Sequence, residues 1–178
     1  EGLREEARQR EYAWLTGDVR AEDRATQYGH RAAIVLFTGS AQTGKTFLAR
    51  RVEALLVADS RHAYLLEGEN LLQGLDADLS AADPSFAAER VRRYGEVARL
   101  LIDTGLIVVS TSKTFGINYQ RMAEMIRTLV QPAPVIAVHM SRAGEEPPPN
   151  TDLHFAGPQD FDAAARQILE ELKRRGVL

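Results

Sequence analysis

The chain has 178 residues, of which 44% are apolar, and its 22 basic and 25 acidic side chains give a formal net charge of −3 at pH 7. This length is enough for one compact domain with a buried core, and the balanced charge argues against a nucleic-acid scaffold, which would cluster Lys and Arg. The absence of cysteine excludes disulfides and thiolate chemistry. No apolar run approaches the ~20 residues that a membrane-spanning helix needs. We therefore expect a cytoplasmic protein that binds neither membranes nor nucleic acid.

The start of the chain is polar. The first residue is Glu1 rather than Met, from which we expect a domain cut from a longer protein. Residues 1–30 are predicted to be a helical lead-in, with one helix or flexible stretch over 3–12 and a short helix over 21–27. Residues 31–178 are predicted to form a single domain.

Short apolar runs then alternate with amphipathic segments. The predicted strands cover residues 31–38, 63–66, 106–110, 134–139 and 151–155, and the predicted helices cover 45–58, 85–103, 117–130 and 161–175. The run AAIVLF within the first strand is uninterrupted, which is typical of a strand buried on both faces of a parallel sheet. This alternation predicts an α/β three-layer sandwich, with a parallel sheet of about five strands and helices on both faces.

A phosphate-binding motif follows the first strand. Residues 39–46, Gly-Ser-Ala-Gln-Thr-Gly-Lys-Thr, match GxxxxGK(S/T) at every fixed position. The two glycines permit close backbone approach, and the loop N–H groups and the next helix N-terminus attract phosphate. The candidate nucleotide-binding residues are Gly39, Ser40, Ala41, Gln42, Thr43, Gly44, Lys45 and Thr46.

The context of the motif separates it from a chance glycine turn, because a buried strand precedes it and a helix follows. We expect a P-loop that binds a purine nucleoside triphosphate with Mg²⁺ as the cofactor. Lys45 is predicted to act catalytically on the β and γ phosphates, while the Thr46 hydroxyl ligates the metal. ATP is the expected phosphoryl donor.

Two glutamates at the end of the second strand are the candidate acids. The guanine-reading Asn-Lys-x-Asp segment of GTPases is absent, and the third strand ends without the carboxylate of large ATPases. Glu67 and Glu69 should emerge at the carboxyl edge of the sheet, beside the loop. Glu67 is predicted either to hold Mg²⁺, directly or through water, or to accept the proton of the acceptor hydroxyl. In the alternative interpretation both are solvated acids that open a helix.

Several short segments, in consistent order, carry a family resemblance. Residues 66–70 (LEGEN) are similar to L-D-G-D-N, residues 89–98 (ERVRRYGEVA) to E-N-I-R-R-x-G-E-V-A, and residues 149–155 (PNTDLHF) to E-N-P-D-L-H-L. Together with the loop and the Trp-containing lead-in, these segments resemble the adenylylsulfate (APS) kinase family over most of the chain. The resemblance implies an ATP-dependent transferase of sulfate assimilation that phosphorylates the 3′-hydroxyl of adenosine 5′-phosphosulfate.

The residues expected to bind the phosphoryl acceptor, which form the acceptor half of the site, depart from the family pattern. Glutamates stand for both aspartates of D-G-D-N, and the long basic lid after the fourth strand is replaced by a short acidic, proline-rich connector. Leu72 and Ala87 stand where the family has arginine, and Asp76 and Arg90 where it has asparagine. The remaining candidates for acceptor binding are Glu69, Asn70, Arg92, Arg93 and Lys113, with the alternative that Arg92 and Arg93 are both surface charges.

These observations leave three hypotheses. The first is a phosphotransferase acting on APS or a related nucleotide, with activity reduced by the rewritten acceptor half. The second is a catalytically degenerate nucleotide-binding domain, regulatory or assembly-forming, within a larger sulfate-activating protein, and the third is a kinase of another small acceptor. The resemblance also implies a homodimer and fusion to a sulfate adenylyltransferase.

Overall fold

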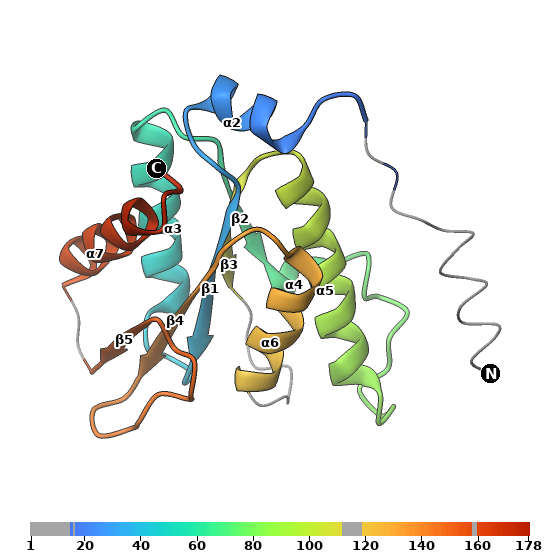
Figure 1. Cartoon of the computed structure of the whole chain (residues 1–178). Coiled ribbons are helices and arrows are strands. Elements are labelled where there is room, and N and C mark those ends of the chain that lie inside the picture. Colours follow the sequence, from blue (N-terminus) through green and yellow to red (C-terminus); the bar gives the residue numbers. More distant parts are fainter. Residues whose placement is uncertain (1–14, 16, 112–118, 158–159) are drawn as a thin grey trace.

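The computed structural model describes residues 15, 17–111, 119–157 and 160–178 (Figure 1). In chain order the elements are α2 (Ala21–Tyr28), β1 (Ala33–Gly39), α3 (Lys45–Ala58), β2 (Ala63–Glu67), α4 (Gly68–Leu71), α5 (Phe86–Asp103), β3 (Ile107–Thr111), α6 (Tyr119–Val130), β4 (Val135–Ser141), β5 (Leu153–Ala156) and α7 (Phe161–Arg174). The predicted strands and helices within these ranges are confirmed with small shifts of their ends. The segment expected over residues 3–12 lies outside the described residues.

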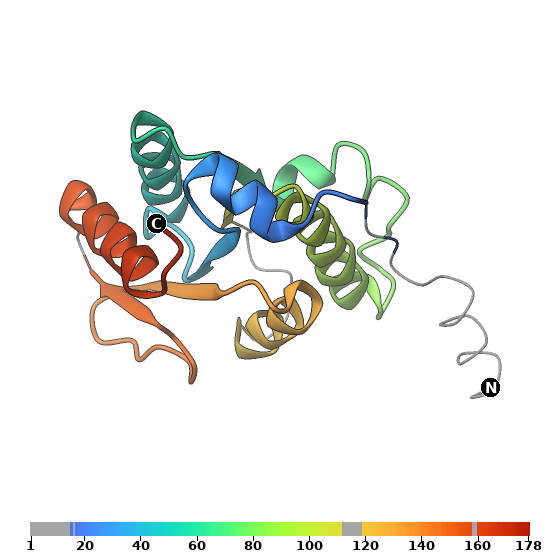
Figure 2. The ribbon, with the colours of Figure 1, turned by 45° about the horizontal axis from the view of Figure 1, so that its top comes forward.

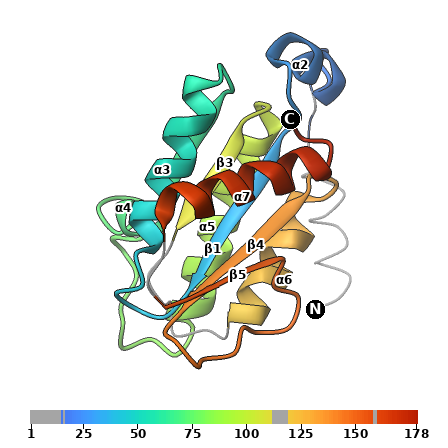
Figure 3. The same ribbon diagram turned by 90° about the vertical axis from the view of Figure 1, so that its left-hand side faces the viewer.

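The five strands form one parallel sheet in the order β2-β3-β1-β4-β5. The predicted central place of β1 is confirmed, and all seven of its residues are buried. Helices α3 and α7 cover one face of the sheet, and α5 and α6 cover the other (Figures 1 and 3). The sequence therefore folds as the expected α/β three-layer sandwich.

The alternation of side chains along β1 builds two cores. Val35 and Phe37 belong to the cluster shared with α3 and α7, whereas Ile34 and Leu36 belong to the cluster shared with α5 and α6. Successive side chains of a strand point to opposite faces, so a strand covered on both faces requires an unbroken apolar run. No helix in the described part of the chain is long and apolar enough to cross a membrane.

The parallel strands bring their carboxyl ends to one edge of the sheet. The arrowheads of β1 and β4 lie at this edge, whereas α2 lies at the opposite, amino end (Figures 1 and 2). Gly39, Glu67, Thr111 and Ser141 end four neighbouring strands there. Ligands of open α/β sheets bind at such an edge.

A buried tyrosine joins this edge to α5. The Tyr94 hydroxyl donates to the Leu66 carbonyl oxygen at 2.9 Å and lies 2.5 Å from Ser110 Oγ and 3.1 Å from the Thr111 carbonyl oxygen. Burial raises the pKa of the Tyr94 hydroxyl well above its usual range. The neutral hydroxyl therefore holds the ends of β2 and β3 against the helix.

Replacement of Tyr94 by phenylalanine should weaken the fold. Tyr94→Phe leaves buried acceptors without their donor, so we expect the free energy of unfolding to fall by about 1–3 kcal/mol in urea denaturation at pH 7. Tyr64 is 48% exposed, and Tyr64→Phe should change this free energy by less than about 0.5 kcal/mol. Equal losses in the two variants would contradict the role of the Tyr94 hydroxyl.

Candidate functional site

Two glycines shape the phosphate loop because neighbouring atoms leave no room for a side chain. Gly39 has φ +122°, and a Cβ there would lie 1.9 Å from the Met140 carbonyl oxygen of β4. Gly44 has φ +87°, and its Cβ would lie 2.6 Å from the ring of Phe161. Both positions therefore require glycine, and the loop packs closely on β4 and α7.

Lys45 bends back over the loop from the first turn of α3. Its Nζ donates to the Gly39 carbonyl oxygen at 2.9 Å and also to the Ser40 carbonyl oxygen. Burial lowers the pKa of Lys45, and the negative charge of Glu69 opposes this shift. The ammonium group is thus held against the loop backbone at the N-terminus of α3, and a helix N-terminus of this kind attracts phosphate.

The predicted acids lie on either side of the start of α4. Glu67 precedes this helix, and its Oε1 lies 3.2 Å from Arg50 Nη2 with the side chain 18% exposed. Glu69 is in the first turn of α4. The alternative interpretation, in which these acids open a helix, therefore describes their local structure. The negative charge of Glu69 also acts on Lys45 of the loop, whose pKa it raises.

The oxygen groups at this edge fit magnesium. Thr46 follows Lys45 in α3, Glu67 ends β2 at this edge, and Glu69 lies in α4, which follows directly. Within the described ranges, no three histidine or acidic side chains gather into a metal-binding group. A hydroxyl and one or two carboxylates are the small set of oxygen ligands that Mg²⁺ takes beside substrate phosphates.

The connector after β4 is tied to the phosphate loop. Ser40 Oγ donates to Glu145 Oε2 at 2.6 Å, and the Arg142 backbone N–H donates to the same oxygen at 3.1 Å. The hydrogen bond from Ser40 is the main cause of a lowered pKa of the Glu145 carboxyl. Apart from the acidity of the connector, nothing in the sequence predicts this contact.

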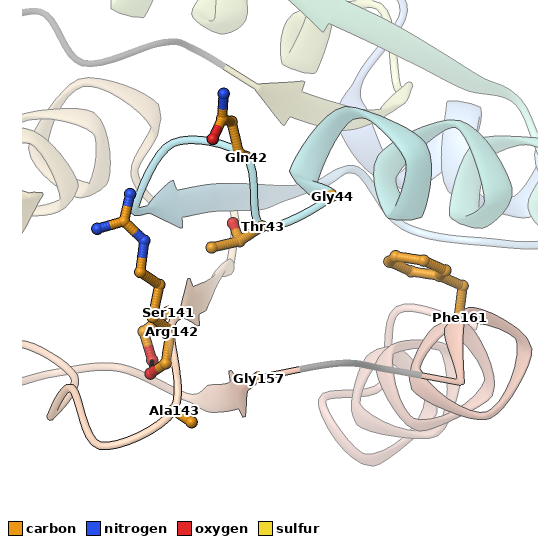
Figure 4. A pocket seen from close by; sticks show the side chains of 8 residues that line it. All are labelled: Gln42, Thr43, Gly44, Ser141, Arg142, Ala143, Gly157 and Phe161. Carbon is orange, nitrogen blue, oxygen red and sulfur yellow. Dashed lines mark hydrogen bonds between the residues drawn. The ribbon is translucent and has the colours of Figure 1, made fainter.

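A hollow of about 550 Å³ opens beside the loop (Figure 4). Two planar groups flank it: Arg142 extends toward the loop, and the Phe161 ring lies under Gly44. The lining residues are Gln42, Thr43, Gly44, Ser141, Arg142, Ala143, Gly157 and Phe161. Arg142 and Phe161 were missed by the sequence analysis, since only the fold brings the ends of β4, β5 and α7 to the loop.

The acceptor-side candidates have mixed positions. Asn70 is exposed on α4, and Lys113 lies outside the described residues. Arg92 pairs with Glu89 at 2.7 Å and is 53% exposed. Arg93 binds Asp78 through two hydrogen bonds of 2.6 and 3.0 Å. The structure therefore places Glu69 in the helix that follows β2 at the carboxyl edge, whereas both arginines are engaged by carboxylates of the protein.

The central strand runs into a loop bordered by two glycines, and a lysine lies over that loop. Together with the oxygen-bearing side chains at the carboxyl edge, these features define a P-loop kinase. Comparisons with known proteins narrow this class. The profile of the family described as adenylylsulphate kinase matches residues 31–147. The chain belongs to this family, as its motifs predicted.

Named relatives agree with the assignment. The chain is 29% identical to the adenylyl-sulfate kinase of Yersinia pestis, over 93% of this chain and 89% of that protein. It is 38% identical to that of Shewanella amazonensis, over 72% and 63% of the two chains. Among solved structures, the Cys556Ala mutant of the Mycobacterium tuberculosis APS kinase CysC is 29% identical with a TM-score of 0.70, covering 81% of this chain and 99% of that one.

Lys45→Ala should remove most of the nucleotide-dependent stabilisation. A ligand at 100 times its Kd adds about 2.7 kcal/mol to the stability of the wild type, and MgADP should therefore raise its Tm. Without nucleotide, the variant should unfold near the wild-type temperature because, among the described residues, Nζ donates to carbonyl oxygens of the loop itself. Lys173, which is 56% exposed on α7, supplies the control variant Lys173→Ala. An unchanged MgADP shift in Lys45→Ala would place the nucleotide elsewhere.

Stability should fall in mildly acidic solution. His139 is buried with Nδ1 at 2.9 Å from Thr38 Oγ1, and burial is the main cause of a pKa lowered from 6.5; the pKa of buried His30 is lowered likewise. The unfolded chain then binds more protons below pH 6.5, so the stability present above that pH is lost as the pH falls toward the folded pKa. Urea unfolding between pH 7.5 and 5.5 should show the free energy of unfolding falling as the pH falls. His139→Gln should make this fall smaller, and an unchanged pH dependence would contradict the contribution of His139.

Proposed function

We propose that this chain transfers a phosphoryl group from MgATP to the hydroxyl of a nucleotide-like acceptor, either APS or a related compound. The observation that carries the proposal is the complete phosphate loop, with glycine at both ends and Lys45 Nζ hydrogen-bonded to the carbonyl oxygens of Gly39 and Ser40. Membership of the adenylylsulphate kinase family supports APS as the acceptor to test first.

The nucleotide would lie along the loop with its base in the 550 Å³ hollow. Arg142 and Phe161 offer planar faces for the purine, and a guanidinium stacks well on an aromatic ring. Lys45 would exchange the carbonyl oxygens of Gly39 and Ser40 for phosphate oxygens. This exchange keeps the ammonium group hydrogen-bonded in both states.

Thr46 and Glu67 would hold the magnesium ion, which neutralises charge on the phosphates during transfer. The contact with Arg50 supports the metal-holding role of Glu67, because it holds that carboxylate at the carboxyl end of β2. Glu69 would then accept the proton of the acceptor hydroxyl. As the acceptor oxygen bonds to the γ-phosphorus, the bond to the β–γ bridging oxygen breaks, ADP leaves, and the hydroxyl proton passes to Glu69.

A nucleotide-binding domain without turnover is the second candidate. It is favoured by the engagement of Arg93 with Asp78 and Glu89 and by the hydrogen bond that ties the short connector to Ser40. In this function the loop and the hollow would bind ATP or ADP, and nucleotide binding would regulate the activity or the assembly of a larger protein. The homodimer and the fusion to a sulfate adenylyltransferase stay predictions.

A coupled assay of ADP release, run with and without APS, separates the candidates. We expect APS-dependent release that Glu69→Gln lowers about 10²–10⁴-fold through loss of the proton acceptor. Glu67→Gln should also lower turnover and raise the Mg²⁺ concentration needed, while ATP binding persists. Glu170, 69% exposed on α7, supplies the control Glu170→Gln. Nucleotide binding without APS-dependent release would favour the second candidate.

A further inference from the structure

One residue of the phosphate loop has a backbone conformation that its side chain disfavours. Gln42 has φ +61°, in the left-handed region. Among the described residues other than glycine, Ser60 and Asn150 also have a positive φ, and asparagine is one of the residue types that adopt it most readily. Residues strained in this way cluster at sites that bind ligands. The loop thus keeps a long polar side chain at a position where glycine would fit without strain.

The protein leaves the Gln42 carboxamide open. The residue is exposed, and no group in the described part of the chain hydrogen-bonds to this side chain. The neighbouring hydroxyl groups of Ser40 and Thr43 instead donate to the Glu145 carboxylate and to the Ser40 carbonyl oxygen. The carboxamide, with two N–H donors and one acceptor oxygen, is therefore available to a ligand of the loop.

Gln42 lies between the two sides of the carboxyl edge. It borders the hollow, and its side chain projects from the loop away from Ser141, Gly157 and Phe161 (Figure 4). These three residues belong to the side of β4, β5 and α7, whereas β2 and Glu67 lie beyond β1 on the other side. A triphosphate with its base in the hollow runs from the first side toward the second. Its last phosphate would therefore pass the Gln42 carboxamide on the way to the acceptor.

An uncharged donor suits a phosphate that is to be transferred. Hydrogen-bond donors fixed in place stabilise the charge on the γ-phosphate oxygens during transfer. ADP lacks this phosphate, so a contact confined to it ends with the reaction. Such a contact adds nothing to the binding of the product.

We propose that the Gln42 carboxamide contacts the transferred phosphate, with Nε2 donating a hydrogen bond to a γ-phosphate oxygen of MgATP. This contact makes Gln42 a catalytic residue at a position that the loop motif leaves open to any residue. It also gives the site a preference for ATP over ADP. The inference rests on the proposed function, since it assumes that the loop binds the triphosphate with its base in the hollow.

The test is titration calorimetry with two ligands, MgADP and the magnesium complex of the non-hydrolysable analogue adenosine 5′-(β,γ-imido)triphosphate. We expect Gln42→Gly to bind the analogue about tenfold more weakly than the wild type, the loss of one hydrogen bond to a charged group. Its affinity for MgADP should change by less than about twofold, because no contact to ADP is lost. In the assay of APS-dependent ADP release, its turnover should fall about 10²-fold.

A second variant keeps the length of the side chain. Gln42→Glu puts a negative charge beside the γ-phosphate, so the analogue should bind more weakly still than to Gln42→Gly. This additional loss should shrink at high salt because added ions screen the repulsion. The analogue should again lose more affinity than MgADP.

Two matched controls separate the contact from strain and from net charge. Ser60, with φ +58°, lies between α3 and β2, and Ser60→Gly relieves the same kind of strain away from the loop. Gln27 is exposed on α2 at the opposite end of the sheet, and Gln27→Glu adds the same charge there. Both controls should bind the two nucleotides as the wild type does. The Tm of Gln42→Gly without nucleotide should be no lower than that of the wild type, because glycine adopts this φ without strain.

The ratio of the two affinities decides the proposal. Equal losses for MgADP and the analogue in Gln42→Gly, or no loss, overturn it. If Gln42→Gly fails to fold, Gln42→Glu decides alone: an unchanged ratio overturns the proposal, and a reduced preference for the analogue supports it. A selective loss without any APS-dependent release in the wild type supports the contact and contradicts only the transfer. Failure of the wild type to bind either nucleotide contradicts the proposed function and this inference together.

Discussion

The site depends on the close approach of two backbones at the end of the central strand. Gly39 lies so near the Met140 carbonyl oxygen that no larger residue fits, and the Ser40 N–H then donates to that oxygen at 3.0 Å. This contact turns the chain out of the sheet. Lys45, six residues after Gly39, can therefore reach back and donate to the Gly39 carbonyl oxygen. The order of the sheet, with β4 directly beside β1, makes the contact available.

The sequence predicted the parts of the molecule that obey local rules. A short unbroken apolar run that leads into a glycine loop is typical of a strand covered on both faces, and the loop motif combines steric and chemical requirements at fixed spacing. The strands, helices and phosphate loop could therefore be expected before the structure was known. The family resemblance is also carried mainly by short local segments of this kind.

Contacts between distant segments could not be predicted. Ser40 and Glu145 are 105 residues apart in the chain, and neither residue type indicates the other. The sequence offered Arg93 as a ligand for the acceptor, but only the folded segment after α4 shows that Asp78 already engages it. The division of roles that we propose for Glu67 and Glu69 likewise depends on the position of Arg50.

The hydrogen bond between Ser40 and Glu145 has an evolutionary consequence. The phosphate-loop motif leaves the position of Ser40 open to any residue, so in most chains it should drift freely. Here a carboxylate of the connector uses its hydroxyl, and a change at either residue deprives the other of a partner. Among relatives with a connector of this length, the two positions should therefore vary together, so that the phosphate loop and the connector evolve as a coupled pair.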